Sequence, residues 1–273
     1  MSKILVDIKV LSLNIYKHNM PPSVKKFSKW SVWIFMLDPQ HSASSVVKKD
    51  SAYSLSSGVP SRGLFIIELM LALLLTRIPY LSVPFKWLES YFHELSHGIA
   101  TLLSGGIVSH IQLFPNGAGF CFSQGGSPLF IGFAGYFGAA CWGYLIYLLA
   151  TWPRGIRVSF ALLGGLVVLS GLLWGRDILT LAILASLTVI FLMPLKLNQN
   201  KVLTQFLRVV GLMIMLNALA SPTVLLGLDG QGDAVLLAEL SWIPAWIWVM
   251  LWLLTSACAL FLAWRRVDSR AYH

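Results

Sequence analysis

The 273-residue chain is too apolar to be a soluble protein. Hydrophobic residues make up 57% of it, charged residues only 11%, and the mean hydropathy is +0.75. Because a soluble domain has roughly a quarter of its residues charged, most of this chain must be surrounded by lipid. The formal net charge is +9, but residues 1–60 alone hold eight Lys and three Asp. Basic clusters beside apolar segments are typical of membrane-surface contacts, so we expect membrane lipid and no nucleic acid as a partner.

Residues 1–60 are more polar than the rest of the chain, and we expect them to form a flexible basic N-terminal tail. Their apolar patch, residues 30–37, is much shorter than the roughly 20 residues that a helix needs to span a bilayer. Residues 61–266 are predicted to form one transmembrane domain, and residues 267–273 a short C-terminal tail.

Seven apolar segments follow one another closely in the central domain. Helices satisfy their own backbone hydrogen bonds in lipid, which makes each segment a candidate spanning helix. The sequence therefore predicts an all-α multi-pass membrane protein of about six or seven helices, which we expect in a bacterial inner membrane. The segments are 63–82, 85–104, 128–152, 156–174, 177–195, 202–220 and 239–264.

The basic residues of the loops suggest an orientation without fixing it. If all seven segments cross the membrane, Arg154, Arg157, Lys196 and Lys201 share one side with the C-terminal arginines. The positive-inside rule favours that side as the cytoplasmic one. The basic N-terminal tail would then lie on the other side, unless one segment does not cross fully.

The stretch 107–123 breaks the helical pattern. Apolar and polar residues partly alternate on both sides of Pro115-Asn116-Gly117. Because Asn-Gly accepts positive φ angles at both turn positions, this pattern predicts a short β-hairpin directly after the segment 85–104. An exposed strand edge in such a hairpin could pair with an extended peptide.

The segment 85–104 contains His93-Glu94-Leu95-Ser96-His97, which matches the pattern HExxH. On a helix, positions i and i+4 share one face, so both imidazoles can bind one zinc ion. Glu94 lies at the flank of that face, where it can act as general base and then acid on a metal-bound water. Ionisable groups inside an apolar helix are costly and therefore indicate function.

A zinc site with two histidines needs a third protein ligand, and downstream acids are scarce. Asp229 and Asp233 lie in a glycine-rich segment, and Glu239 follows them. Asp233 also precedes an apolar run and could be a helix N-cap. Upstream, Glu89 shares a helix face with His93, so it could orient this imidazole or be an interfacial carboxylate near Lys86.

These motifs resemble those of the site-2 protease superfamily of intramembrane zinc metalloproteases, in particular its small bacterial B-type branch. The similarity covers roughly residues 78–262. It depends on F-H-E-L-S-H-G, on Gly105-Gly106 followed by P-N-G-A-G, on A-G-Y-F-G-A at 134–139, and on G-D-A-V-L-L-A with Ile243-Pro244.

The resemblance implies cleavage of membrane-spanning or membrane-associated protein substrates within the bilayer. It implies His93 and His97 as zinc ligands, Glu94 as catalytic acid/base and an aspartate as the third ligand. The step Gly232-Asp233-Ala234 is closer to the B-type branch, which favours Asp233. Asp229 is the alternative, because Asn217, Pro222 and Asp229 follow the order of the main branch at wider spacing.

Small residues recur at helical spacing between Gly132 and Gly143, which predicts close packing between membrane helices. The alternative to a protease is a non-proteolytic membrane scaffold or transporter-like protein that retains a metal site. A transporter often shows inverted internal repeats, and the sequence shows no convincing repeat.

Overall fold

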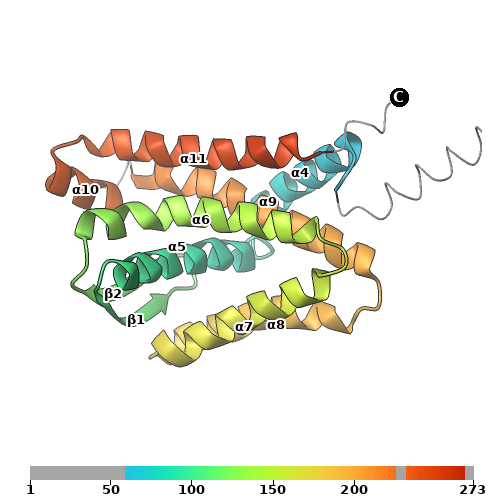
Figure 1. The fold of residues 1–273 in the computed structure, drawn as a ribbon, viewed down its shortest axis with the longest axis horizontal. Helices are drawn as coiled ribbons and strands as arrows, with labels where there is room; N and C mark the ends of the chain where they lie inside the picture. Colours follow the sequence, from blue (N-terminus) through green and yellow to red (C-terminus); the bar gives the residue numbers. More distant parts are fainter. Residues whose placement is uncertain (1–58, 226–231, 268–273) are drawn as a thin grey trace, which may run out of the picture. The chain divides into compact units, whose positions relative to one another are not determined.

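The computed structural model describes residues 59–225 and 232–267, which contain eight α-helices and one β-hairpin (Figure 1). The predicted tails 1–60 and 267–273 lie almost entirely outside the described residues, so the division into domains stays a prediction. The elements are α4 Arg62–Arg77, α5 Val83–Leu103, β1 Ile107–Leu113, β2 Gly119–Gln124, α6 Pro128–Ala150, α7 Ile156–Trp174, α8 Ile178–Leu192, the 3-10 helix η2 Met193–Lys196, α9 Asn200–Val224, α10 Asp233–Ser241 and α11 Ala245–Arg265.

Five helical spans in the described part are long and apolar enough to cross a membrane. They are Pro128–Ala150, Ile156–Trp174, Ile178–Lys196, Asn200–Val224 and Ala245–Arg265. The prediction of an all-α multi-pass membrane protein with a hairpin after the HExxH helix is therefore confirmed, and the chain is an integral membrane protein.

The first two predicted spans and the last one differ from the structure. The segment 63–82 gives the 16-residue helix α4, and 85–104 gives α5, which carries three charged residues. The segment 239–264 is divided between α10 and α11, because Trp242 adopts a left-handed conformation (φ 63°) and Pro244 follows it. Proline has no N–H to donate within a helix, and it caps the start of α11 instead.

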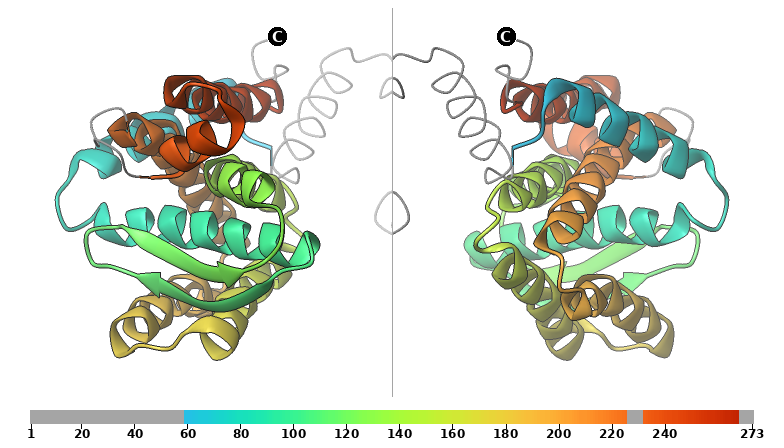
Figure 2. Two further views of the ribbon diagram at one scale, coloured as in Figure 1. Left: turned by 90° about the vertical axis from the view of Figure 1, so that its left-hand side faces the viewer. Right: turned by 90° about the vertical axis from the view of Figure 1, so that its right-hand side faces the viewer.

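Helix α6 lies in the middle of the bundle. It packs against α9, α5, α10 and α11, while α7 and α8 form a pair on the far side of the hairpin (Figure 1). In the left view of Figure 2, α6 is seen nearly end-on, whereas α5 and both strands lie across the view. The HExxH helix is therefore oblique to the spanning helices, with the hairpin on one side and α6 on the other.

Local sequence features explain where α5 begins and where it ends. Pro84 occupies the first turn, where its missing N–H costs nothing. At the other end, Gly105 has a φ of +84°, which glycine adopts without strain. The next residue, Gly106, touches the second strand so closely that a Cβ atom would lie 2.8 Å from the carbonyl oxygen of Gln124. The hairpin is thus held directly against the end of α5.

The hairpin is antiparallel, with Leu113 opposite Gly119 at its tip. Its turn is longer than the predicted Asn-Gly turn: residues 114–118 connect the strands, and of these only Gly117 has a positive φ, +91°. The outer edge of β1 is occupied, because Ile111 forms a parallel bridge with Gly175. The Leu113 N–H also donates a hydrogen bond to Thr180 Oγ1 at 2.9 Å.

A buried ion pair that the sequence analysis did not identify connects α4 to α9. Glu68 and Arg208 are each 3% exposed, and Arg208 Nε donates to both carboxylate oxygens, at 3.1 and 2.9 Å. Because a lone charge is costly in an apolar environment, each residue depends on the other. The pair fixes the first described helix to the centre of the bundle.

We predict that Glu68→Ala lowers the free energy of unfolding by about 3–5 kcal/mol, because it leaves the Arg208 guanidinium buried without its carboxylate. The double variant Glu68→Ala/Arg208→Met should recover much of this loss, since it removes both charges. Unfolding by SDS titration in mixed micelles measures the difference. The exposed Glu239→Ala on α10 is the control and should be neutral. A Glu68→Ala variant as stable as the wild type would contradict this role.

Candidate metal centre

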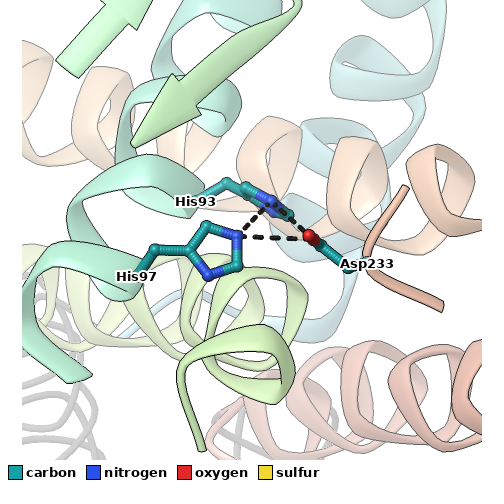
Figure 3. Close-up of side chains that lie close together, drawn as sticks. All are labelled: His93, His97 and Asp233. Atoms are coloured by element: carbon teal, nitrogen blue, oxygen red, sulfur yellow. Dashed lines mark hydrogen bonds and ion pairs between the residues drawn. The ribbon is translucent and has the colours of Figure 1, made fainter. Parts of the chain in front are cut away.

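Two imidazoles and one carboxylate meet at the start of α10 (Figure 3). His93 and His97 lie on the same face of α5 and are buried, and Asp233 is the first residue of α10. The two Nε2 atoms are 3.0 Å apart, and Asp233 Oδ2 lies 3.1 Å from His93 Nε2 and 3.3 Å from His97 Nε2. Within the described part of the chain, these residues form the only His/Cys/Asp/Glu group with metal-binding geometry.

The ring of His97 is oriented by a backbone carbonyl of α6. Its Nδ1 atom lies 2.7 Å from the carbonyl oxygen of Ile131. A carbonyl only accepts hydrogen bonds, so Nδ1 carries the proton and Nε2 presents its lone pair toward Asp233. In a metal-binding histidine, the ring nitrogen that does not bind the metal usually donates such a hydrogen bond, which fixes the orientation of the ring.

Gly135 brings the backbone of α6 directly against the two imidazoles. A Cβ atom at this position would lie 2.5 Å from His97 Nε2 and 2.6 Å from His93 Nε2. One turn later, a Cβ at Gly138 would overlap the side chain of Ser96. The small residues of α6 therefore serve close packing, as the sequence predicts, and Gly135 also leaves the space that the imidazoles need.

Tyr136 supports the other imidazole and was not singled out by the sequence analysis. Its ring lies edge-on to His93, with centroids 4.3 Å apart, and it packs against Trp252 at 4.8 Å. Trp252 is fixed in turn by a hydrogen bond from its Nε1 to the carbonyl oxygen of Phe133, at 3.1 Å. An aromatic residue in an apolar helix carries no distinguishing signal, so this contact could not be found without the helix register.

Glu94 is 4% exposed and lies between the histidines and the second strand. The approach of that strand is close: a Cβ atom at Gly119 would lie 2.7 Å from Glu94 Cγ and 2.8 Å from Ser90 Oγ. Glu89 is also buried, at 6% exposure. Both carboxylates line the same cavity.

The cavity beside the three residues has a volume of about 650 Å³. It is bounded by α5, β2, the start of α6 and the start of α10, and it is lined by both polar and apolar side chains. Its wall includes alternate residues of β2, namely Gly119, Cys121 and Ser123, which share one face of the hairpin. Two imidazole nitrogens and one carboxylate oxygen beside an open cavity could hold a metal ion with one position left for water or substrate.

Glu239, which was also considered from the sequence, does not join this cluster. Glu239 is exposed on α10, and Asp229 lies outside the described residues. The N-cap of α10 is Gly232, with a φ of +102°, so the interpretation of Asp233 as an N-cap is wrong. Asp177 caps α8: the Thr180 N–H donates to its Oδ1 at 2.8 Å and holds the pKa of this carboxyl below its usual range.

A membrane-embedded helix bundle with a His-His-Asp cluster beside a buried glutamate has the form of an intramembrane metallopeptidase. The chain matches the family model described as Peptidase M50B-like over residues 66–263, and it belongs to this family. The matched region contains all of the residues of the cluster and most of the described helices. No curated protein and no solved structure matches the chain.

We predict that Gly135→Ala prevents metal binding, because the added methyl group would occupy the space of both Nε2 atoms. Metal content of the purified variant, measured by mass spectrometry after dialysis, checks this. Gly165→Ala on α7 is the matched control: nothing lies within 4 Å of a Cβ atom there, so its metal content should equal that of the wild type. Equal metal content in both variants would show that α6 does not contact the site as described.

Proposed function

We propose that this chain is a zinc endopeptidase that cleaves membrane-spanning or membrane-associated proteins within the bilayer. The observation that supports it most is the approach of Asp233 to the Nε2 atoms of His93 and His97, beside Glu94. Membership of a peptidase family supports the reaction type. The proposed roles are His93, His97 and Asp233 as ligands and Glu94 as the acid/base.

Zinc fits this donor set better than Mg²⁺ or Ca²⁺ does. Two imidazoles and one carboxylate are typical zinc ligands, whereas Mg²⁺ and Ca²⁺ prefer oxygen donors only. The described cluster also lacks the thiolates of most structural zinc sites. When bound, zinc would polarise the scissile carbonyl group and lower the pKa of a water molecule beside it.

Glu94 is placed to move the protons of the reaction. Its carboxylate is buried in the cavity wall, one residue from His93, and no cation forms an ion pair with it among the described residues. It would accept a proton from the attacking water and then donate one to the amine of the leaving peptide, as a general base and acid. Burial keeps competing water away from this carboxylate and strengthens its electrostatic effect.

The substrate peptide would bind in extended form along β2. The outer edge of β1 is taken by Gly175, whereas β2 has no second partner strand among the described residues, and three of its alternate residues line the cavity. An added strand can satisfy the backbone groups of the outer edge of β2, and alternate side chains would point into the cavity. A helical substrate hides its peptide bonds, so we infer that a cleavable substrate unwinds locally before it pairs with β2.

We predict that Asp233→Ala weakens zinc binding by about 10-fold to 100-fold or more, because one of three protein ligands is lost. The affinity can be measured by competition with a fluorescent chelator. Glu239→Ala, six residues later on the same helix and exposed, should bind zinc like the wild type. If Asp233→Ala keeps full affinity, the third ligand must come from elsewhere, and Asp229→Ala should then be measured.

We predict that Glu94→Gln retains stoichiometric zinc and loses cleavage activity by about 100-fold to 10,000-fold, because the general base is removed and the ligands are kept. His97→Ala should lose both zinc and activity. Cleavage can be followed by immunoblot in cells that co-produce the chain with a set of epitope-tagged single-span membrane proteins. The proposal would be refuted if the purified wild-type protein contained no zinc, or if the Glu94→Gln variant produced the same cleavage products in equal amounts. Either result would favour a non-proteolytic membrane protein.

A further inference from the structure

The cavity beside the metal centre extends along α5 beyond the three ligands. Glu89 and Ser90 line it about one turn before His93, and Ser221, near the end of α9, lines it as well. The rise of an α-helix places Glu89 about 6 Å from His93 along the axis of α5. None of these three polar residues has a role in the proposed reaction. We call the part of the cavity lined by Glu89, Ser90 and Ser221 the Glu89 subsite.

Glu89 is a buried carboxylate without a cationic partner. It is 6% exposed, and it accepts a hydrogen bond from the hydroxyl of Ser221. Among the residues that the structure describes, no Lys or Arg forms an ion pair with it. Lys86, about one turn earlier on α5, is exposed. Because a buried charge is costly without an opposite charge beside it, the subsite is incomplete without a cation.

Ser90 supplies a second polar group without a partner. It is 5% exposed, and its Oγ atom is buried and forms no hydrogen bond with any described residue. This atom faces β2, since a Cβ atom at Gly119 would lie 2.8 Å from it. A helical serine often donates to the carbonyl oxygen four residues earlier, as Ser96 does to Phe92 at 2.6 Å. An unpaired buried hydroxyl that lines a cavity indicates a partner on the ligand.

The charges around the cavity are unbalanced. Its described lining contains three carboxylates, those of Glu89, Glu94 and Asp233, and no Lys or Arg. Histidine ligands are neutral when they bind a metal, so a zinc ion offsets two of the three negative charges. Asp233 is the proposed ligand and Glu94 the proposed acid/base, which leaves Glu89 as the carboxylate that a substrate can neutralise.

We propose that the Glu89 subsite binds a Lys or Arg side chain of the substrate, an inference that rests on the proposed function. The carboxylate of Glu89 pairs with the cation, and the hydroxyl of Ser90 accepts one of its N–H groups. An extended chain advances about 3.3 Å per residue and turns alternate side chains to the same face. A distance of about 6 Å from His93 therefore corresponds to a basic residue about two positions from the cleaved bond.

Peptide hydroxamates test the subsite by binding alone, without any cleavage. The hydroxamate group binds zinc, and the first, second or third attached residue is either lysine or norleucine, which has a side chain of similar length without the charge. Displacement of a fluorescent hydroxamate from the purified wild-type protein in detergent measures the affinities. At one position, lysine should bind roughly 10-fold to 100-fold more tightly than norleucine, because a hydrogen bond to a charged group contributes about this much. Equal affinities at all three positions would overturn the inference.

Glu89→Gln should remove the preference for lysine, because the amide keeps the size of the side chain and loses its charge. Its zinc content should equal that of the wild type, whereas a role in orienting His93 would weaken zinc binding and leave the preference unchanged. Ser90→Ala should weaken lysine binding by about 2-fold to 10-fold and leave norleucine binding as it is. The exposed Glu239→Gln is the control and should keep the full preference. A preference that persists in Glu89→Gln would overturn the assignment to this residue.

The same measurements separate this inference from the proposed function. A protein that binds both compounds equally well keeps the proposed metal centre and has no cation subsite. A protein that binds neither compound has no accessible zinc, and the proposed function then fails together with the subsite. In cells, replacing the basic residue about two positions from a cleaved bond by Met should slow cleavage by the wild type about 10-fold and have no effect with Glu89→Gln.

Discussion

The contact between α5 and α6 is the constraint on which the rest of this structure depends. At Gly135 the backbone of α6 approaches two imidazoles so closely that no side chain fits between them. The same helix supplies the carbonyl group of Ile131, which orients His97, and the ring of Tyr136, which supports His93. A single helix face thus determines both the space and the orientation of the histidines.

The surrounding bundle makes this contact rigid. Helix α6 packs against α9 and α11, and α9 is fixed to α4 by the buried pair of Glu68 and Arg208. On its other side, α5 is held by the hairpin, which is anchored in turn by Thr180 and Gly175 of the α7–α8 pair. The middle of this oblique helix is therefore buried. Five of its polar residues line one cavity: Glu89, Ser90, His93, Glu94 and His97.

The sequence predicts those features that depend on local spacing. Residues four apart share a helix face, so the spacing of His93 and His97 predicts that their imidazoles lie side by side. The glycine-rich turn residues likewise predict the hairpin. Contacts between distant helices depend on their relative register, which no local pattern specifies. The fit of Gly135 against the imidazoles and the pairing of Glu68 with Arg208 therefore emerged only from the structure. The predicted segments 63–82 and 85–104 became α4 and α5, which are not among the candidate spans, because α4 has 16 residues and α5 carries three charged residues.

The central claim is that two histidines and one aspartate hold a zinc ion with an open position. X-ray absorption at the zinc edge of the purified wild-type protein in detergent tests it most directly. We expect a first shell of nitrogen and oxygen atoms only, at about 2.0–2.2 Å, with the outer-shell scattering of two imidazoles. A shell that contains sulfur at about 2.3 Å, or the scattering of only one imidazole, would contradict it.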